Sequence, residues 1–180
     1  MSGQPVGFDV ISVIPTEPAT AQSPALVIQS GDSVTLKAYL HFKGQPFQKA
    51  ALDTYLTTTS SGGTPEAIVV YHLQDLITGA MVPSIFGGTI TALSATDVTN
   101  AVTQGDLPPG SGISSPANEG WWLSADTANI TTGDSGSGAN LEVPAGFDAG
   151  TWRVLTHVHS TVPARQFAAF DDNLVIEVTD

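Results

Sequence analysis

Four histidines occur in the sequence, and two of them are spaced so that they could act together. His157 and His159 are two residues apart in the segment Thr151 to His159, whose alternation predicts an inward face made of Trp152, Val154, Thr156 and Val158. Side chains at positions i and i+2 of a strand project from the same face. Neutral imidazoles are preferred ligands of Zn²⁺ and Cu²⁺. His157 and His159 are therefore candidate metal ligands.

His72 is the third candidate ligand. It lies in the segment Glu66 to Leu76, whose alternation predicts a strand with His72 on the outward face and Ala67, Val69, Tyr71 and Leu73 on the other. Where this strand pairs with that of His157, three imidazoles gather on one outer sheet face and suit copper or zinc. The alternative is a set of solvent-exposed strand histidines without a ligand.

Trp121 and Trp122 are adjacent and follow Gly120 at the start of an expected strand. On a strand, neighbouring side chains point to opposite faces, so one indole faces inward and the other outward. The outward indole is a candidate contact for a sugar or a protein partner, because aromatic residues are enriched at binding hot spots. The alternative is partial burial of this indole beneath the irregular segment 79–120.

Other chemistries find little support in the sequence. The absence of cysteine excludes disulfides, thiol catalysis and Cys-ligated metal sites. A formal net charge of −12 argues against nucleic acid or an anionic membrane as the main partner. The segment Gly133 to Ser137 resembles the active-serine segment of chymotrypsin-like proteases, but no histidine has the sequence context of that family's base. We therefore expect Gly133 to Ser137 to be a loop.

Strand periodicity dominates the chain, and helical periodicity is almost absent. We expect one domain over residues 1–180, since this length supports a single hydrophobic core. The expected strands include 8–14, 25–29, 33–42, 66–76, 151–159 and 173–179, with a turn at 44–46. In the middle of the chain we expect 82–86 to pair with 89–93, and a short helix over 94–103.

Two segments resemble immunoglobulin-like domains. Leu-x-Val-Pro at 141–144 followed by Ala-Gly-Thr-Trp-x-Val at 149–154 resembles the corner between strands E and F, and Gly31 to Leu36 resembles the start of strand B. The resemblance implies an all-β, Ig-like antiparallel β-sandwich with an irregular insertion around 79–120. Strand C pairs directly with strand F in such domains, which would place His72 beside His157.

A second resemblance concerns the histidine pair. The stretch Gly150 to Ser160 is similar to the end of the soluble copper-binding domain of the ammonia/methane monooxygenase family, and Asp32 to Gly44 is similar to an earlier strand of that domain. The resemblance implies copper binding by His157 and His159. The N-terminal histidine and the membrane helix of that family have no counterpart in this sequence.

The composition is typical of surface proteins, with 21 Thr and 16 Ser but only 12% charged residues, against about 25% in ordinary globular domains. No signal peptide or transmembrane segment is evident, so we expect cytoplasmic synthesis, with a virion or extracellular location after release. The expected function is a non-catalytic β-sandwich binding or structural module, such as a virion or particle surface protein or a partner-binding protein. It would need no cofactor, would bind a protein or glycan, and could form a homo-oligomer or particle.

Two alternatives to this function stay open. One is a copper- or zinc-binding domain that uses His72, His157 and His159. The other is a ligand-binding accessory protein of a biosynthetic pathway.

Overall fold

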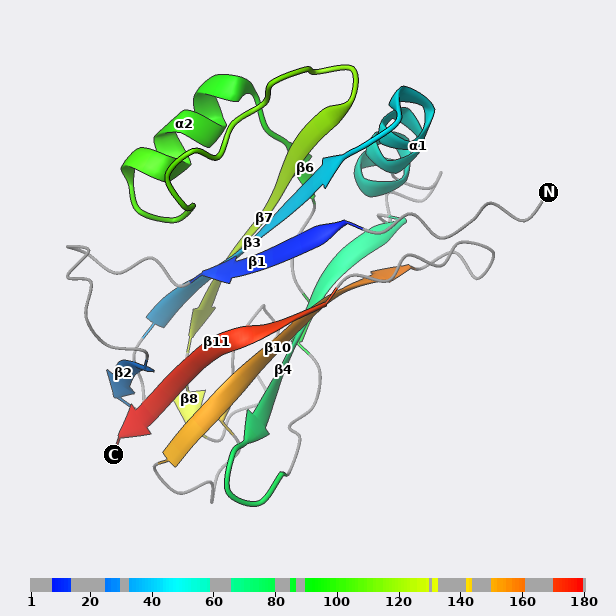
Figure 1. The fold of residues 1–180 in the computed structure, drawn as a ribbon. Helices are drawn as coiled ribbons and strands as arrows, with labels where there is room; N and C mark the ends of the chain where they lie inside the picture. The colour runs from blue at the N-terminus through cyan, green and yellow to red at the C-terminus, as the bar shows by residue number, and fades with distance from the viewer. Residues whose placement is uncertain are drawn as a thin grey trace.

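The computed structural model describes residues 8–13, 25–29, 33–58, 66–79, 85–86, 90–129, 131–132, 142–143, 150–160 and 170–179. Within these ranges the chain is mostly β, with two principal sheets and two short helices (Figure 1). The elements are β1 (Asp9–Val13), β2 (Ala25–Gln29), β3 (Ser33–Lys43), α1 (Pro46–Thr57), β4 (Ala67–Asp75), β5 (Ile85–Phe86), β6 (Thr91–Ala92), α2 (Ala95–Thr103), β7 (Glu119–Asn129), β8 (Thr131–Thr132), β9 (Glu142–Val143), β10 (Gly150–Ser160) and β11 (Phe170–Thr179). The predominantly β class expected from the alternation is confirmed.

The first sheet has the strand order β1-β3-β7-β6, and all its pairs are antiparallel. Its centre is the long pair of β3 and β7, whose register runs from Ser33 opposite Asn129 to Lys43 opposite Glu119. This register decides which outward side chains of the two strands become neighbours.

The second sheet has the order β2-β11-β10-β4-β5. Its pairs are antiparallel except for β2, which runs parallel to β11, so the expectation of a wholly antiparallel fold is wrong at this edge. A separate small pair, β8 with β9, is also parallel. β4 and β10 are direct neighbours, and β1 of the first sheet lies against β11 of the second (Figure 1).

The core contains the side chains that the alternation predicts to be inward. In β10 all four residues of the predicted inward set are buried, and in β4 the first three are: Trp152, Val154, Thr156 and Val158, with Ala67, Val69 and Tyr71. From the first sheet, Ala38 and Leu40 of β3 and Trp122 of β7 are also buried. In each long strand whose side chains are described, every second side chain is therefore buried on one face of the strand.

The opposite face of the first sheet is covered by α2 and the loop that follows it. Tyr39 and Trp121 of this face form a buried cluster with Val98, Ala101 and Leu107. The helix starts at a capping box, in which the Ser94 hydroxyl accepts from the backbone of Asp97 and the Asp97 carboxylate accepts from the backbone of Ser94. The short helix expected over 94–103 is therefore confirmed.

The expectation of a simple turn at 44–46 is incomplete, because α1 begins at Pro46 and was not predicted. Proline suits the first helical turn, where its missing N–H would have no partner. Leu52, Tyr55 and Leu56 follow at the three- and four-residue spacing of an amphipathic helix, and all three are buried. This spacing was a readable signal for the helix.

The expected pairing of 82–86 with 89–93 is wrong. β5 pairs with β4 in the second sheet, whereas β6 pairs with β7 in the first. The two short segments thus belong to different sheets, because each finds a longer strand to pair with.

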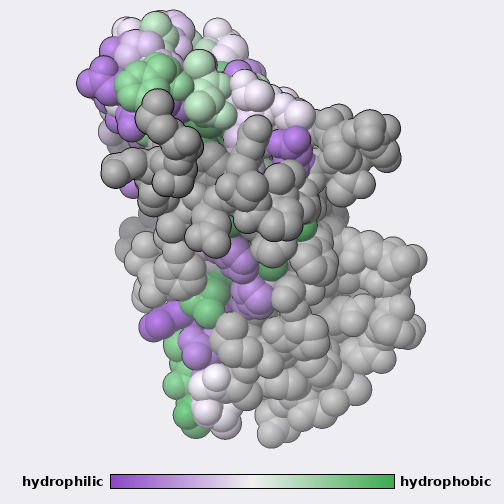
Figure 2. Space-filling view, turned by 90° about the vertical axis from the view of Figure 1, so that its right-hand side faces the viewer, coloured by the Kyte–Doolittle hydropathy of each residue, from purple (hydrophilic) through white to green (hydrophobic). Residues whose placement is uncertain are grey.

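Large hydrophobic side chains are exposed at two places in the described part of the chain. Phe47 of α1 is 73% exposed, and Leu76 and Ile77 follow β4 at 42% and 87%. In Figure 2 hydrophobic and hydrophilic residues mix at the end of the molecule that carries the helices. The described residues form two helices, α1 and α2, and neither is long and apolar enough to cross a bilayer.

Candidate functional site

A cavity of about 530 Å³ opens on the covered face of the first sheet, between the sheet and the loop after α2. This volume lies within the roughly 300–1,000 Å³ that is usual for small-ligand sites. The lining residues come from β1, β3, β7 and the loop: Ile11, His41, Lys43, Pro108, Pro109, Gly110, Ser111, Gly112, Ile113, Ser114, Glu119 and Trp121. We refer to this cavity as the main pocket.

The strand register builds the base of the main pocket. His41 lies directly opposite Trp121, and Lys43 lies directly opposite Glu119. All four have odd numbers on antiparallel strands in this register, so they share the face that carries Tyr39. The sheet therefore presents a compact group of one aromatic and three ionisable side chains to the pocket.

The loop over the pocket is held in place by its own hydrogen bonds. The Ser111 hydroxyl donates to the carbonyl of Pro108 at 2.8 Å, and Gly110 has a φ of +91°, which glycine adopts without strain. The Trp121 indole Nε1–H donates to the carbonyl of Gly112 at 3.0 Å and ties the loop to β7. The wall of the pocket is thus preformed.

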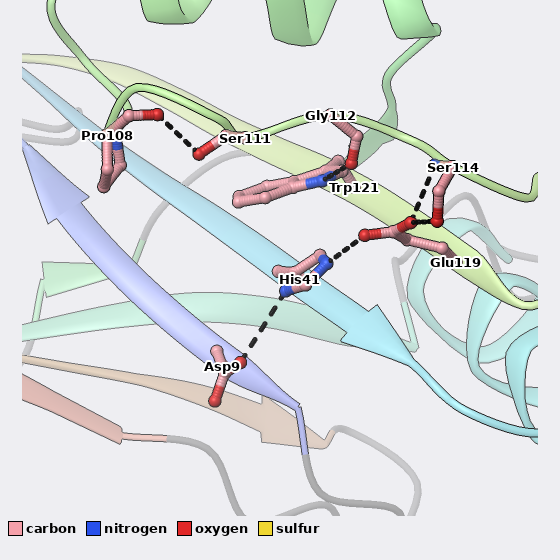
Figure 3. A network of polar contacts seen from close by, with 8 residues as sticks. All are labelled: Asp9, His41, Pro108, Ser111, Gly112, Ser114, Glu119 and Trp121. Carbon is pink, nitrogen blue, oxygen red and sulfur yellow. Dashed lines mark hydrogen bonds and ion pairs between the residues drawn. The ribbon is translucent and has the colours of Figure 1, made fainter.

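His41 lies between two carboxylates and against an indole (Figure 3). Its Nε2 is 2.9 Å from Oε1 of Glu119, and its Nδ1 is 3.7 Å from Oδ2 of Asp9. The imidazole stacks on Trp121, with ring centroids 4.2 Å apart and planes 25° from parallel. These contacts fix the ring on both edges and one face.

Glu119 is a buried carboxylate with several donors. Its Oε2 accepts hydrogen bonds from the backbone N–H of Ser114 at 2.8 Å and from the Ser114 hydroxyl at 2.7 Å. Burial, the largest influence, acts to raise the pKa of Glu119, but the bonds from Ser114 and His41 and the charge of Lys43 together lower it to about 2. Glu119 is therefore an anion at neutral pH.

The order of these groups does not suit nucleophilic catalysis. A serine nucleophile needs a histidine base on its hydroxyl, with the carboxylate behind the histidine. Here the carboxylate of Glu119 lies between, because the Ser114 hydroxyl donates to Glu119 and His41 contacts the other oxygen. The arrangement is suited to holding a fixed polar surface.

A second polar network anchors the start of the loop. The carboxylate of Asp106 is 2.9 Å from the Lys37 ammonium and accepts a 2.7 Å hydrogen bond from the Tyr39 hydroxyl. Burial first, and then the bond and charge of Asp106, raise the pKa of Tyr39. Asp106 immediately precedes Leu107 of the buried cluster, so this network fixes the loop against β3.

A smaller cavity of about 280 Å³ lies on the α1 side of the same loop. It shares Ile113, Glu119 and Trp121 with the main pocket and is also lined by Lys49 and Asp53 of α1. The Trp122 indole Nε1–H donates to Asp53 at 2.8 Å, which attaches α1 to the first sheet.

The structure brings two of the three predicted metal-ligating histidines together. The rings of His72 and His157 stack at a centroid distance of 5.2 Å with planes 7° from parallel. The backbone of His159 pairs with Ile68, and its side chain lies outside the described part of the structure. Among the described residues, no group of three or more His, Cys, Asp and Glu side chains could hold a metal ion.

The parallel arrangement of His72 and His157 places the rings face to face. The lone pair of an imidazole nitrogen lies in the ring plane, so stacked rings do not aim their nitrogens at one point. The pair fits a metal only after one ring rotates.

Trp121 and Trp122 do face opposite ways, but both are buried, at 4% and 1% exposure. Trp122 belongs to the inward face of β7, and Trp121 lies under α2 and its following loop. Trp121 is thus the outward indole, and it is buried because α2 and the following loop, both within segment 79–120, pack on this face of the sheet. Trp121 still forms part of the pocket wall.

Sequence patterns did not single out the residues at the base of the main pocket. His41 lies on β3, and nothing local in the sequence indicated Glu119 as its partner, 78 residues later. The available signal was the two-residue spacing of Glu119 and Trp121, which places both side chains on one face of a strand. The segment Gly133 to Ser137 lies outside the described residues.

Comparisons with known proteins found no counterpart. No protein-family model, no curated protein and no solved structure matches the chain. The function is therefore inferred from the pocket and its chemistry.

Proposed function

We propose that this chain is a non-catalytic binding module, in which the main pocket receives a small group or short segment of a partner. The observation that carries the proposal is the pocket of about 530 Å³ with polar groups fixed at its base. Preorganised groups bind with a smaller ordering cost than mobile ones. His41 and Glu119 are held by several contacts each, which supports a binding role.

We infer that the framework is an immunoglobulin-like β-sandwich. Such sandwiches place strands A, B, E and D in one sheet and C, F and G in the other. In their order across the sheet, β1, β3, β7 and β6 would correspond to strands A, B, E and D, and β4, β10 and β11 would correspond to strands C, F and G. The strand order supports this assignment, and α1 and α2 then lie in the connections before C and before E.

In this proposal the module belongs to a surface or partner-binding protein, such as a virion or particle component. The partner is a protein or glycan, and no cofactor is required. The Ser- and Thr-rich composition with few charges supports a role at a surface. The covered face of the first sheet is the contact surface, because the main pocket opens there.

The substitution Gly112→Phe tests the binding role of the main pocket. Gly112 lines the pocket, and a Cβ at this position would meet no atom within 4 Å, so the phenyl ring should fill the cavity without disrupting the fold. A small-fragment library is screened by ¹H–¹⁵N NMR on both proteins. We expect fragments to shift pocket resonances in the wild type and to lose this effect in Gly112→Phe.

The matched control is Thr99→Phe, which adds the same ring on the exposed side of α2. This variant should bind fragments as the wild type does. Fragment binding that avoids the pocket, or that survives Gly112→Phe, would show that the main pocket is not the binding site.

A second candidate function is copper or zinc binding by His72, His157 and His159. The pairing of β4 with β10 supports this candidate, because it places His72 and His157 on adjacent strands, and one ring would rotate to bring both nitrogens to one ion. We expect Cu²⁺ titration to give near-stoichiometric binding that is lost in His157→Ala and weakened at acid pH, where imidazoles are protonated. His41→Ala, away from this pair, is the control, and binding unchanged in His157→Ala would overturn the candidate.

A further inference from the structure

Two of the three lysines of this acidic chain line the two cavities. The sequence has three lysines and two arginines against 17 acidic residues. Lys37 pairs with Asp106 beneath the loop, Lys43 lines the main pocket and Lys49 lines the smaller cavity. A chain with a formal net charge of −12 thus has two of its three lysines at the cavities, where their charge would attract an anionic group.

Lys43 is the lysine positioned to contact a ligand. It is exposed at the end of β3 and lines the main pocket. Within the described residues, no carboxylate lies within the 4 Å of an ion pair with Lys43, whereas Lys37 is engaged by Asp106. The Lys43 ammonium is therefore available for an ion pair with a bound group.

The acidic groups at the pocket are already compensated. Glu119 accepts three hydrogen bonds, from the backbone and hydroxyl of Ser114 and from His41. Asp9 faces His41, and its side chain is 82% exposed at the rim, where water screens its charge. Lys43 lies opposite Glu119 and its charge helps to lower the pKa of Glu119, so an incoming carboxylate would share this ammonium group with Glu119.

The remaining wall is largely apolar. Ile11, Pro108, Pro109 and Ile113 line the pocket beside these polar groups. An apolar wall next to one available cation suits a ligand with a hydrophobic body and a single negative end.

We propose that the main pocket binds an organic carboxylate, with the carboxylate paired to Lys43 and an apolar body against Ile11, Pro108 and Ile113. The inference rests on the proposed binding function and specifies its ligand class. A carboxylate of this kind belongs either to the C-terminus of a peptide or to a free carboxylic acid.

The experiment compares acids with their uncharged amides. The probes are hexanoate and hexanamide, and a blocked tetrapeptide with a C-terminal leucine as the free acid and as the amide. Binding is followed by NMR at the indole N–H of Trp121, which bonds to the pocket loop and is assigned with Trp121→Phe. We expect at least one acid to bind roughly tenfold or more tightly than its amide, since a charge-assisted bond is the stronger kind.

Substitution of Lys43 locates the charge effect. Lys43 is exposed, and Lys43→Gln keeps a long polar side chain at this position. The substitution should weaken binding of the acid about tenfold and leave binding of the amide unchanged. Lys49→Gln is the matched control, because it removes the same charge from the smaller cavity, and it should bind within about twofold of wild type.

The outcomes separate the two proposals. Tighter binding of the peptide acid than of hexanoate identifies a chain terminus as the ligand, and the reverse identifies a free acid. Equal binding of acids and amides at the pocket, or an acid preference unchanged in Lys43→Gln, overturns the carboxylate inference and leaves the pocket function standing. No response from any probe overturns the carboxylate inference, whereas the fragment screen with Gly112→Phe decides the pocket function separately.

Discussion

Glu119 stays ionised although only 7% of its side chain is exposed, because hydrogen-bond donors surround both of its oxygens. A buried carboxylate without partners would be costly, whereas one with three donors contributes to stability. The same bonds attach the loop at Ser114 to the start of β7. The charge of Glu119 therefore contributes to the position of the loop, together with the bonds of Ser111 and Trp121.

Acid should weaken the fold through Glu119. The folded-state pKa of about 2 lies below the ordinary value of 4.5, so the stabilisation is present above pH 4.5 and is lost as the pH falls from about 4.5 to about 2. We expect Glu119→Gln to lower the free energy of unfolding at pH 7 by roughly 1–2 kcal/mol, less than the full shift because the pocket opens to solvent. Urea denaturation between pH 2 and 7 measures this dependence.

The control for this measurement is Asp9→Asn, which removes an exposed carboxylate from the other edge of His41. It should keep most of the wild-type stability and the acid-dependent loss. A curve for Glu119→Gln that runs parallel to the wild type from pH 4.5 to 2 would contradict the assignment.

At the scale of elements, a polar contact joins α1 to the first sheet. Trp122 is 1% exposed, and its indole N–H donates to Asp53 of α1. Leu52, Tyr55 and Leu56 bury the apolar face of the same helix. The helix is thus fixed by packing along one face and by a directional bond to the first sheet.

Asp53→Ala should lower the free energy of unfolding by about 1–3 kcal/mol, because it leaves a buried indole N–H without its acceptor. Asp53→Asn retains an oxygen acceptor and should lie much closer to the wild type. Thermal and urea denaturation of both variants measure the difference. Equal losses in the two variants would show that the carboxylate charge, and not the hydrogen bond, stabilises the helix.

At the scale of the whole molecule, the charge distribution opposes compactness. A net charge of −12 with five basic residues leaves most carboxylates without an opposite charge. Self-repulsion of this kind destabilises the folded state, and salt screens it. The part-buried Lys37–Asp106 pair is less sensitive to salt, because buried and partly buried pairs are screened less than exposed ones.

We therefore expect the melting temperature to rise with NaCl between about 0.01 and 0.3 M, where the screening length falls from roughly 30 Å to below 10 Å. A gain of about 1 kcal/mol would raise it by roughly 2–4 °C for a chain of this size. Differential scanning calorimetry at constant pH makes the measurement. A melting temperature that falls with salt would mean that ion pairs, and not repulsion, dominate.

Local patterns predicted the features that depend on local physics. Alternation identified the buried face of β10, from Trp152 to Val158, because side chains of a strand alternate between two faces. The short helix over 94–103 was correctly expected, and the spacing of Ser94 and Asp97 is a local signal for its start, because a capping box forms within one turn. Helix α1 was not predicted, although Leu52, Tyr55 and Leu56 have the three- and four-residue spacing of an amphipathic helix.

Only the tertiary structure decided the pocket. His41 meets Glu119 across 78 residues and Lys37 meets Asp106 across 69, and such meetings depend on strand register. Register is set by the burial of whole strand faces, which no short segment encodes. The sequence by itself determined which side chains alternate toward a core. The pairing of β3 with β7, and the packing of α2 on them, determined that the outward group of His41, Trp121 and Glu119 became the base of a pocket instead of an open surface.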